Sequence, residues 1–184
     1  MIVMNLGKLT REKTAFVLID VQEKFVPVMG DADKIVHNIN ILTKAAEILK
    51  IPLIVTEQYP KGLGKTYEKI HIPNADVIEK IEFSCFDNKE FFHKIKEKGV
   101  NSLVLFGVES HVCVLKTALD AIENGIEVHV VADAVSSRTE ENRKLALKRM
   151  RQSGVFIVST EMIIFQLMEK AGTEEFKRIG GLVK

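Results

Sequence analysis

An aspartate ends one strongly apolar segment of the chain, and a cysteine lies five residues after the end of a second such segment, at residues 101–108. Asp20 ends the apolar run TAFVLID at residues 14–20, and Cys113 ends the segment GVESHVC at residues 107–113. If a helix begins near Ser110, the helix dipole and free N–H groups would lower the pKa of the Cys113 thiol. The thiolate is a nucleophile, and a carboxylate can take the thiol proton during attack. These residues indicate nucleophilic catalysis. The alternatives are a buried, inert Cys113 and a helix-capping Asp20.

Lys80 is a third residue that could take part in this chemistry. An ammonium group beside a thiolate and a carboxylate lowers the thiol pKa and stabilises negative charge in the transition state. The spacing along the chain does not by itself place Lys80 near Asp20 or Cys113. A structural or solvated lysine therefore remains the alternative.

Strands that alternate with helices would position these side chains. Short β-branched and apolar runs predict six strands, at residues 14–20, 52–57, 77–81, 101–108, 126–132 and 156–160. Helical spacing and capping patterns predict helices at residues 33–50, 87–98, 110–124, 138–153 and 161–171. The helix at 138–153 would begin with the capping box Ser137-x-x-Glu140. The alternation predicts an α/β fold, a three-layer α/β/α sandwich around a six-stranded parallel sheet, in one domain over residues 1–184.

The carboxyl ends of the strands are the expected place for a site. With the doubly wound strand order 3-2-1-4-5-6, the strand ending at Asp20 and the strand before Cys113 are neighbours at the switch point, where such sheets bind ligands. The segment 58–76 contains two prolines and two glycines and predicts a long loop over one end of the fold. Long ordered loops are commonly functional. The charged tail at residues 173–184 is expected to pack outside the core.

Composition narrows the function classes. The chain has 184 residues, is 46% hydrophobic, and carries 26 Lys and Arg against 25 Asp and Glu, for a net charge of +1. This balance argues against a nucleic-acid or anionic-membrane partner. Two cysteines cannot form a disulfide framework or a structural zinc site. The opening residues lack a signal-peptide pattern, and no apolar run approaches the roughly 20 residues that span a bilayer, so we expect a cytoplasmic protein.

Five short motifs resemble those of the isochorismatase-like cysteine hydrolases, in the same order along the chain. They are LIDVQ at 18–22, Lys80 followed by Phe83-Ser84, GVESHVC at 107–113, VADA and SSR within 131–138, and RMRQSG at 149–154. The similarity runs from about Thr14 to Lys177. The stretch TEQYPKGLG at 56–64 resembles the subgroup of isochorismatase domain-containing proteins. Each motif is weak alone, but together on the expected elements they form a strong signal.

The resemblance implies a catalytic triad of Asp20, Lys80 and Cys113. In such enzymes the carboxylate accepts the thiol proton, the sulfur attacks an electrophilic carbon, and water resolves the covalent intermediate. The family also has a cis peptide bond before the nucleophile turn, which here corresponds to Val108–Glu109. The resemblance further implies that the N–H groups of Glu109 and Cys113 bind the developing oxyanion.

The chain also departs from one branch of these relatives. Nicotinamidases carry an Asp-x-His pattern and further histidines that bind a metal. The corresponding loop here offers Glu57, Gln58 and Tyr59, with His71 as the only nearby histidine. We therefore expect no metal and no other cofactor. Phe25, Glu57 and Tyr59 are candidate substrate-binding residues, with ordinary packing as the alternative for the aromatic side chains.

The sequence thus predicts a metal-independent cysteine hydrolase of a small amide, ester or related C–N compound, acting through a covalent intermediate on Cys113. Relatives commonly associate, so we expect a homo-oligomer, with the C-terminal helices as an interface. Cys85 is expected to be a buried, inert residue. Two alternatives remain open. One is a catalytically reduced scaffold that binds a metabolite or a partner protein, and the other is a redox sensor that uses Cys113.

Overall fold

Six parallel strands form a single sheet in the order β3-β2-β1-β4-β5-β6, as predicted. The structure is a computed structural model that describes residues 5–183. Residues 1–4 and 184 lie outside the described part of the chain. They include both ends of the predicted domain and the first residues of the segment that lacks a signal-peptide pattern. The strands are β1 (Thr14–Ile19), β2 (Leu53–Gln58), β3 (Asp76–Lys80), β4 (Ser102–Val108), β5 (Glu127–Ser136) and β6 (Phe156–Val158).

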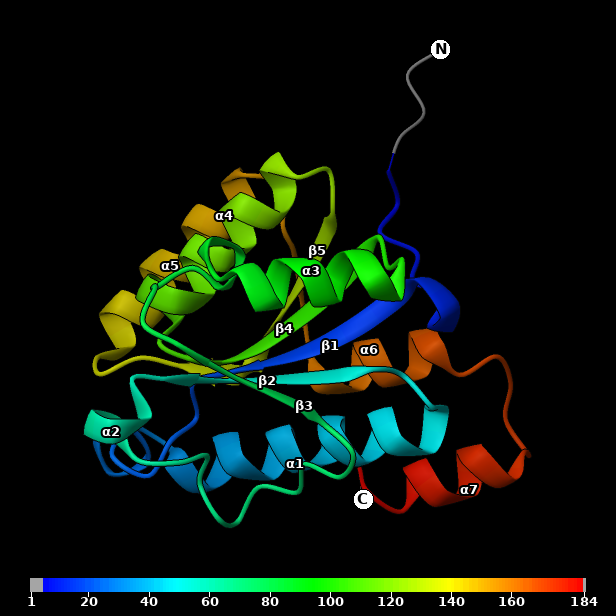
Figure 1. Cartoon of the computed structure of the whole chain (residues 1–184). Coiled ribbons are helices and arrows are strands. Elements are labelled where there is room, and N and C mark those ends of the chain that lie inside the picture. Colours follow the sequence, from blue (N-terminus) through cyan, green and yellow to red (C-terminus); the bar gives the residue numbers. More distant parts are fainter. Residues whose placement is uncertain (1–4, 184) are drawn as a thin grey trace.

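Helices cover both faces of this sheet and make a three-layer α/β/α sandwich. Figure 1 shows α3, α4 and α5 on one face and α1, α6 and α7 on the other. The helices are α1 (Ala32–Leu49), α2 (Pro60–Leu63), α3 (Lys89–Lys98), α4 (Leu115–Glu123), α5 (Glu140–Gln152), α6 (Thr160–Leu167) and α7 (Glu174–Gly180). Among the residues that the structure describes, no helix is both long and apolar enough to cross a membrane.

The two central strands are apolar after their first residues, Thr14 and Ser102, because helices cover both of their faces (Figure 1). Every residue of β1 and β4 is buried. Phe16 of β1 and Phe106 of β4 meet edge to face, with ring centroids 6.0 Å apart. Burying one such side chain contributes roughly 1.5–3 kcal/mol. The continuous apolar runs that predicted these strands thus form the core that supports the carboxyl edge of the sheet.

Helix starts differ from the prediction by one or two residues, except that α4 begins five residues late, at Leu115, after a π-helical turn over Ser110–Val114. The cap of α5 is Thr139, whose hydroxyl accepts from the N–H of Asn142. The predicted cap, Ser137, follows directly after β5, and its hydroxyl instead contacts the ring of His111 at 3.0 Å. Asn88, and not Asp87, caps α3. Strand β5 extends four residues beyond the predicted range, and this extension moves the start of the helix along the chain.

The C-terminal segment was wrongly predicted to pack outside the core. Residues 174–180 form α7, and its Ile179 is fully buried. Arg11 binds Glu175 with both of its terminal nitrogens, at 3.1 and 2.9 Å, and so ties α7 to the segment before β1. The charges that suggested a solvated tail lie on the outer side of an amphipathic helix.

Candidate active site

Strands β1 and β4 are neighbours, so the residues that follow them meet at one edge of the sheet. Ile19 pairs with Gly107 in the parallel register. Gly107 has a φ of +118°, and a Cβ atom there would lie 2.2 Å from the carbonyl oxygen of Ile19. Only glycine allows this close approach. It brings the turn that carries Cys113 next to Asp20, as the predicted strand order requires.

A buried ion pair joins Asp20 to Lys80. The Lys80 Nζ lies 2.7 Å from Oδ2 of Asp20, and neither side chain is exposed to solvent. The hydroxyl of Thr56 donates to the other carboxylate oxygen at 2.7 Å. Burial alone would lower the pKa of Lys80, but the charge of Asp20 and the two nearby cysteines raise it above its ordinary value. Lys80 is therefore a charged ammonium at neutral pH.

Cys113 lies in a single π-helical turn, η4 (Ser110–Val114), that precedes α4. Burial raises the pKa of its thiol, the negative charge of Asp20 and a hydrogen bond to it raise the pKa further, and Lys80 opposes them. The prediction of a lowered pKa was therefore wrong, because burial and Asp20 outweigh Lys80 and the helix dipole. The resting group is a thiol, and its proton has to leave during any attack by the sulfur.

Cys85 lies in the short helix η3 (Cys85–Asp87) and is completely buried, as expected. Its backbone N–H donates to the Thr117 hydroxyl at 3.0 Å, and Thr117 lies one helical turn beyond Cys113. Burial raises the pKa of the Cys85 thiol to about 11. Both cysteines near Lys80 are therefore protonated thiols at neutral pH.

The turn that carries Cys113 is fastened to the end of β5 and to the loop that follows it. The Val108–Glu109 peptide bond is cis, as the resemblance implied. The Glu109 carboxylate accepts from the backbone N–H of Arg138 at 3.1 Å and from its Nε at 3.0 Å. The Ser110 hydroxyl donates to the carbonyl of Ser136 at 2.8 Å. These contacts fix the backbone from Glu109 to Cys113, which carries the predicted oxyanion N–H groups.

Two residues at this site, Thr56 and Gln58, were not identified from the sequence. The Gln58 Oε1 accepts from Lys80 at 2.6 Å and lies 4.0 Å from the Cys113 Sγ. Side chains two residues apart on a strand point to the same side, so Thr56 and Gln58 both face the ion pair. This period-two pattern in the segment Thr56-Glu57-Gln58 was the signal that could have found them.

Glu57 points to the other side and holds the loop that follows β2. Its carboxylate accepts from the backbone N–H of Thr66 at 2.7 Å and from the Thr66 hydroxyl at 2.8 Å. The Lys65 ammonium lies 3.2 Å away. The side chain of Glu57 is therefore fully occupied by contacts within the protein, which favours a structural role over the predicted contact with substrate.

The two aromatic residues predicted to bind substrate differ in their exposure. Tyr59 is 55% exposed, and together with Lys80 and Ile81 it lines a cavity of about 340 Å³. Phe25 is partly buried and packs against the core. Tyr59 thus lies on the surface beside the ion pair, whereas Phe25 belongs to the loop after β1.

The histidine considered as a metal ligand makes an ordinary surface contact. His71 Nε2 lies 3.0 Å from the carboxylate of Glu47 on α1. Within residues 5–183, no group of three or more His, Cys, Asp or Glu side chains is arranged to hold a metal ion.

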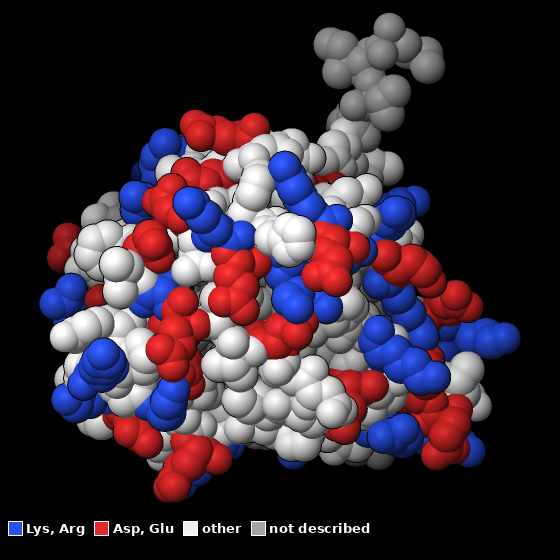
Figure 2. All heavy atoms as spheres, in the orientation of Figure 1, with Lys and Arg blue, Asp and Glu red and all other residues white. Residues whose placement is uncertain are grey.

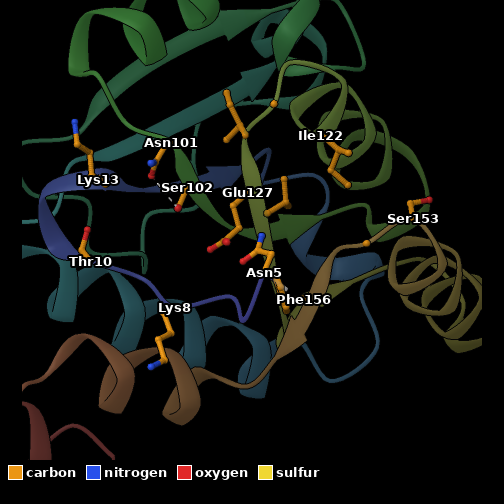
Figure 3. Close-up of a pocket in the computed structure, with 14 residues that line it drawn as sticks. Asn5, Lys8, Thr10, Lys13, Asn101, Ser102, Ile122, Glu127, Ser153 and Phe156 are labelled. Atoms are coloured by element: carbon orange, nitrogen blue, oxygen red, sulfur yellow. Dashed lines mark hydrogen bonds between the residues drawn. The ribbon is translucent and has the colours of Figure 1, made fainter. Parts of the chain in front are cut away.

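A larger cavity, of about 660 Å³, lies at the opposite edge of the sheet. Figure 3 shows it between the first residues of three strands, Ser102, Glu127 and Phe156, with Lys8 and Lys13 nearby. None of the residues of the predicted triad lines it. Open parallel sheets bind ligands beyond the carboxyl ends of their strands. The cavity at the carboxyl edge, although it is the smaller of the two, is therefore the better candidate site.

The fold and this edge together define an α/β/α protein of the isochorismatase-like hydrolase class. A family model for the isochorismatase domain matches residues 14–162, which include all six strands. The chain belongs to the isochorismatase family.

Individual relatives match the chain along nearly its whole length. Isochorismatase family protein 1B from Dictyostelium discoideum is 40% identical, over 99% of this chain and 91% of that protein. The secreted isochorismatase effector Isc1 from Phytophthora sojae is also 40% identical, over 98% of this chain and 89% of that protein.

Solved structures share the fold. A MAR1 ribonuclease from Caenorhabditis elegans superposes with a TM-score of 0.90 at 37% identity, over 96% of this chain and 92% of that chain. The YcaC gene product of Escherichia coli, described as an octameric hydrolase of unknown specificity, superposes with a TM-score of 0.80. It is 27% identical, over 90% of this chain and 84% of that chain.

Proposed function

We propose that the protein is a metal-independent cysteine hydrolase that cleaves a small amide, ester or related C–N compound through a covalent intermediate on Cys113. The observation that carries this proposal is the buried Asp20–Lys80 pair beside a protonated thiol. Burying two charges is destabilising unless they are well paired, and such pairs with strongly shifted neighbours cluster at functional sites. Membership of the isochorismatase family and the hydrolase relative in Escherichia coli support the same reaction class.

In the first half of the proposed reaction, Asp20 accepts the Cys113 proton while the sulfur bonds to the carbonyl carbon. The π electron pair of the carbonyl moves to its oxygen, where the N–H groups of Glu109 and Cys113 stabilise the charge. Lys80 holds the Asp20 carboxylate in place at 2.7 Å. Each Asp20 oxygen already accepts one hydrogen bond, and each retains a lone pair that can take the proton.

In the second half, the tetrahedral adduct collapses and the leaving amine or alcohol takes the proton from Asp20. The resulting thioester is attacked by water, whose proton passes to the Asp20 carboxylate. Collapse of that adduct releases the acid, and the sulfur regains its proton from Asp20. The reaction consumes only the substrate and water, and it needs no redox or group-transfer partner.

The surface around the site favours a small substrate with an apolar portion. Tyr59, Ile81 and Phe83 are exposed apolar residues, at 55%, 73% and 55%, and all three lie where β2 and β3 end. We assign Tyr59 to a wall of the substrate site and Phe25 to the loop that faces it after β1. Glu57 would influence this wall only through the loop that it holds.

The test is a panel of small amides and esters screened with the purified protein. Cys113→Ala should abolish turnover of any substrate found, and Cys85→Ala should retain it, because Cys85 is completely buried. Intact mass spectrometry after rapid quenching should show an acyl adduct on the wild-type chain only. Full turnover by Cys113→Ala would contradict the proposal.

The low exposure of Cys113, 5%, favours one alternative, a scaffold that binds a metabolite or a partner without chemistry. That alternative predicts saturable binding of a panel compound, equal in the wild type and in Cys113→Ala, with no acyl adduct and no product. The same screen therefore separates the two functions.

RNA is a further compound class to include, because one relative is described as a ribonuclease. Figure 2 shows acidic and basic side chains interspersed over the visible face. With a net charge of +1, we expect no RNA cleavage and no salt-dependent RNA binding. Cleavage that is lost in Cys113→Ala would extend the substrate class to RNA.

Two further parts of the proposal concern assembly and location. The octameric relative supports a homo-oligomer. A cytoplasmic location remains a prediction, and one relative is described as a secreted effector. Fractionation of the source cells and culture medium tests that prediction directly.

A further inference from the structure

Gln58 is held at the centre of the site through its backbone and through both ends of its side-chain amide. Its backbone N–H and C=O bond the side-chain amide of Gln22 at 2.8 and 3.0 Å. Its Nε2 donates to the carbonyl of Ile81 at 2.8 Å, and its Oε1 accepts from Lys80 at 2.6 Å. A carbonyl can only accept and an ammonium can only donate, so the orientation of this amide is unambiguous.

We propose that Gln58 is a positioning residue, whose uncharged oxygen holds the Lys80 ammonium and keeps a second negative charge away from the Cys113 thiol. The inference rests on the proposed role of Cys113 as nucleophile. Lys80 has three N–H bonds, and they go to Asp20 at 2.7 Å, to Gln58 at 2.6 Å and to the carbonyl of Glu82 at 3.2 Å. Only Asp20 among these acceptors carries a charge, so the buried pair is neutral as a whole.

Replacing this oxygen by a charged one would oppose the chemistry. The Oε1 of Gln58 lies 4.0 Å from the Cys113 Sγ. A carboxylate at this distance would disfavour the thiolate and the oxyanion that follows it. It would also share Lys80 with Asp20 and weaken the hold of the ammonium on the catalytic carboxylate.

Removing the oxygen altogether should have the opposite effect on the thiol. With methionine at position 58, Lys80 loses one of its three acceptors. The freed N–H bond can then turn to the Cys113 sulfur and favour the thiolate. The inference therefore predicts shifts of opposite sign for Gln58→Glu and Gln58→Met. A merely structural role would loosen the site in both variants and shift both in the same direction.

The experiment measures the rate at which iodoacetamide alkylates Cys113 between pH 7 and pH 9, with peptide mapping to separate it from Cys85. We expect Gln58→Glu to slow alkylation at least tenfold at pH 9. Gln58→Met should make alkylation faster than in the wild type across the same pH range. Gln152→Glu makes the same charge change at an exposed position at the end of α5, and its profile should match the wild type.

Shifts of the same sign in both variants, or a wild-type profile in a folded Gln58→Glu, would overturn the inference. If Gln58→Glu does not fold, Gln58→Met decides alone, because an unchanged or slower alkylation of Cys113 contradicts the role of Lys80. Alkylation needs no substrate. Failure of the proposed function would appear as turnover by Cys113→Ala, whereas failure of this inference would appear in the alkylation profile.

Discussion

At the scale of single residues, we expect Asp20 to contribute to stability as well as to the proposed chemistry. Asp20→Asn leaves the Lys80 ammonium buried without its carboxylate, and breaking such a pair on one side costs about 3–5 kcal/mol. We expect urea denaturation to show a loss of this size, and the double variant Asp20→Asn/Lys80→Met to recover part of it. If the free energy of unfolding of Asp20→Asn lay within about 1 kcal/mol of the wild-type value, the ion pair would not have the predicted importance.

Cys85 should make the protein sensitive to alkaline pH. Its thiol pKa rises from 9.0 to about 11 in the fold, so above pH 9 the unfolded chain loses a proton that the folded chain keeps. The stabilisation is complete below pH 9 and is lost between pH 9 and 11, by about 2–3 kcal/mol. Cys85→Ala is expected to be less stable at pH 8 but to lose less stability on going to pH 11. Parallel curves of unfolding free energy against pH would contradict this prediction.

The sequence identified the chemistry-bearing residues better than their environment. Asp20 and Cys113 follow strands whose apolar runs are unmistakable, so their meeting at one edge could be predicted. The pKa of the Cys113 thiol could not be predicted, because it depends on how deeply the thiol is buried and on how Asp20 and Lys80 lie around it. Glu57 was a candidate for substrate binding because it lies in the segment that corresponds to the metal-binding pattern of nicotinamidases. Side chains alternate along β2, so Glu57 points to the side opposite Thr56 and Gln58.

At the scale of elements, the contact between β1 and β4 depends on Gly107. Gly107→Ala would place a methyl group 2.2 Å from the Ile19 carbonyl oxygen in a backbone conformation that alanine rarely adopts. Strain and overpacking together should destabilise the fold by about 3 kcal/mol or more. Thermal denaturation checks this, with Gly125→Ala as the control for strain alone, since Gly125 also has positive φ but nothing within 4 Å. Equal losses in the two variants would show that close approach is unimportant.

The loop after β2 should loosen when Glu57 is removed. Glu57→Ala takes away the acceptor of the Thr66 N–H, and a hydrogen bond to a charged group contributes about 1.5–3 kcal/mol. Hydrogen exchange at Thr66 should therefore become at least tenfold faster, while alkylation of Cys113 stays close to the wild-type rate. Unchanged exchange at Thr66 would contradict the structural role of Glu57.

Element boundaries were predicted less well than element types. Continuous apolar runs located β1 and β4, because burial on both faces determines the composition of these strands. The cap of α5 was placed two residues early, since Ser137 and Thr139 are both capping residues and only the length of β5 decides between them. The π-helical turn at Ser110–Val114 leaves no pattern in the sequence that separates it from an ordinary helix start.

At the scale of the whole molecule, α6 presents two large exposed apolar side chains. Met162 and Phe165 are 57% and 48% exposed and lie three residues apart, so they share one face of the helix. We predict that the wild type elutes above its monomer mass of 20.7 kDa and that Met162→Glu/Phe165→Glu elutes as a smaller species. Leu145→Glu on α5, which is equally exposed, is the control. Identical elution of the double variant and the wild type would place any interface elsewhere.

The sheet order could be predicted as a whole because short connections and alternating elements permit few topologies. The packing of α7 could not, since one buried residue, Ile179, decides it among several charged neighbours. Long-range contacts such as Arg11 with Glu175 join the two ends of the chain and have no local pattern.

The Asp20–Lys80 pair also bears on how the proposed activity could be lost over time. Two charges that are sealed from solvent usually gain nothing over well-fitted apolar side chains, which are often the more stable choice. In a descendant without the Cys113 thiol, selection would no longer preserve the two charged residues. Leucine or methionine at positions 20 and 80 would then make the fold more stable. Homologues that retain the ion pair but lack the cysteine would therefore have lost the cysteine recently, or would use the two charges in another reaction.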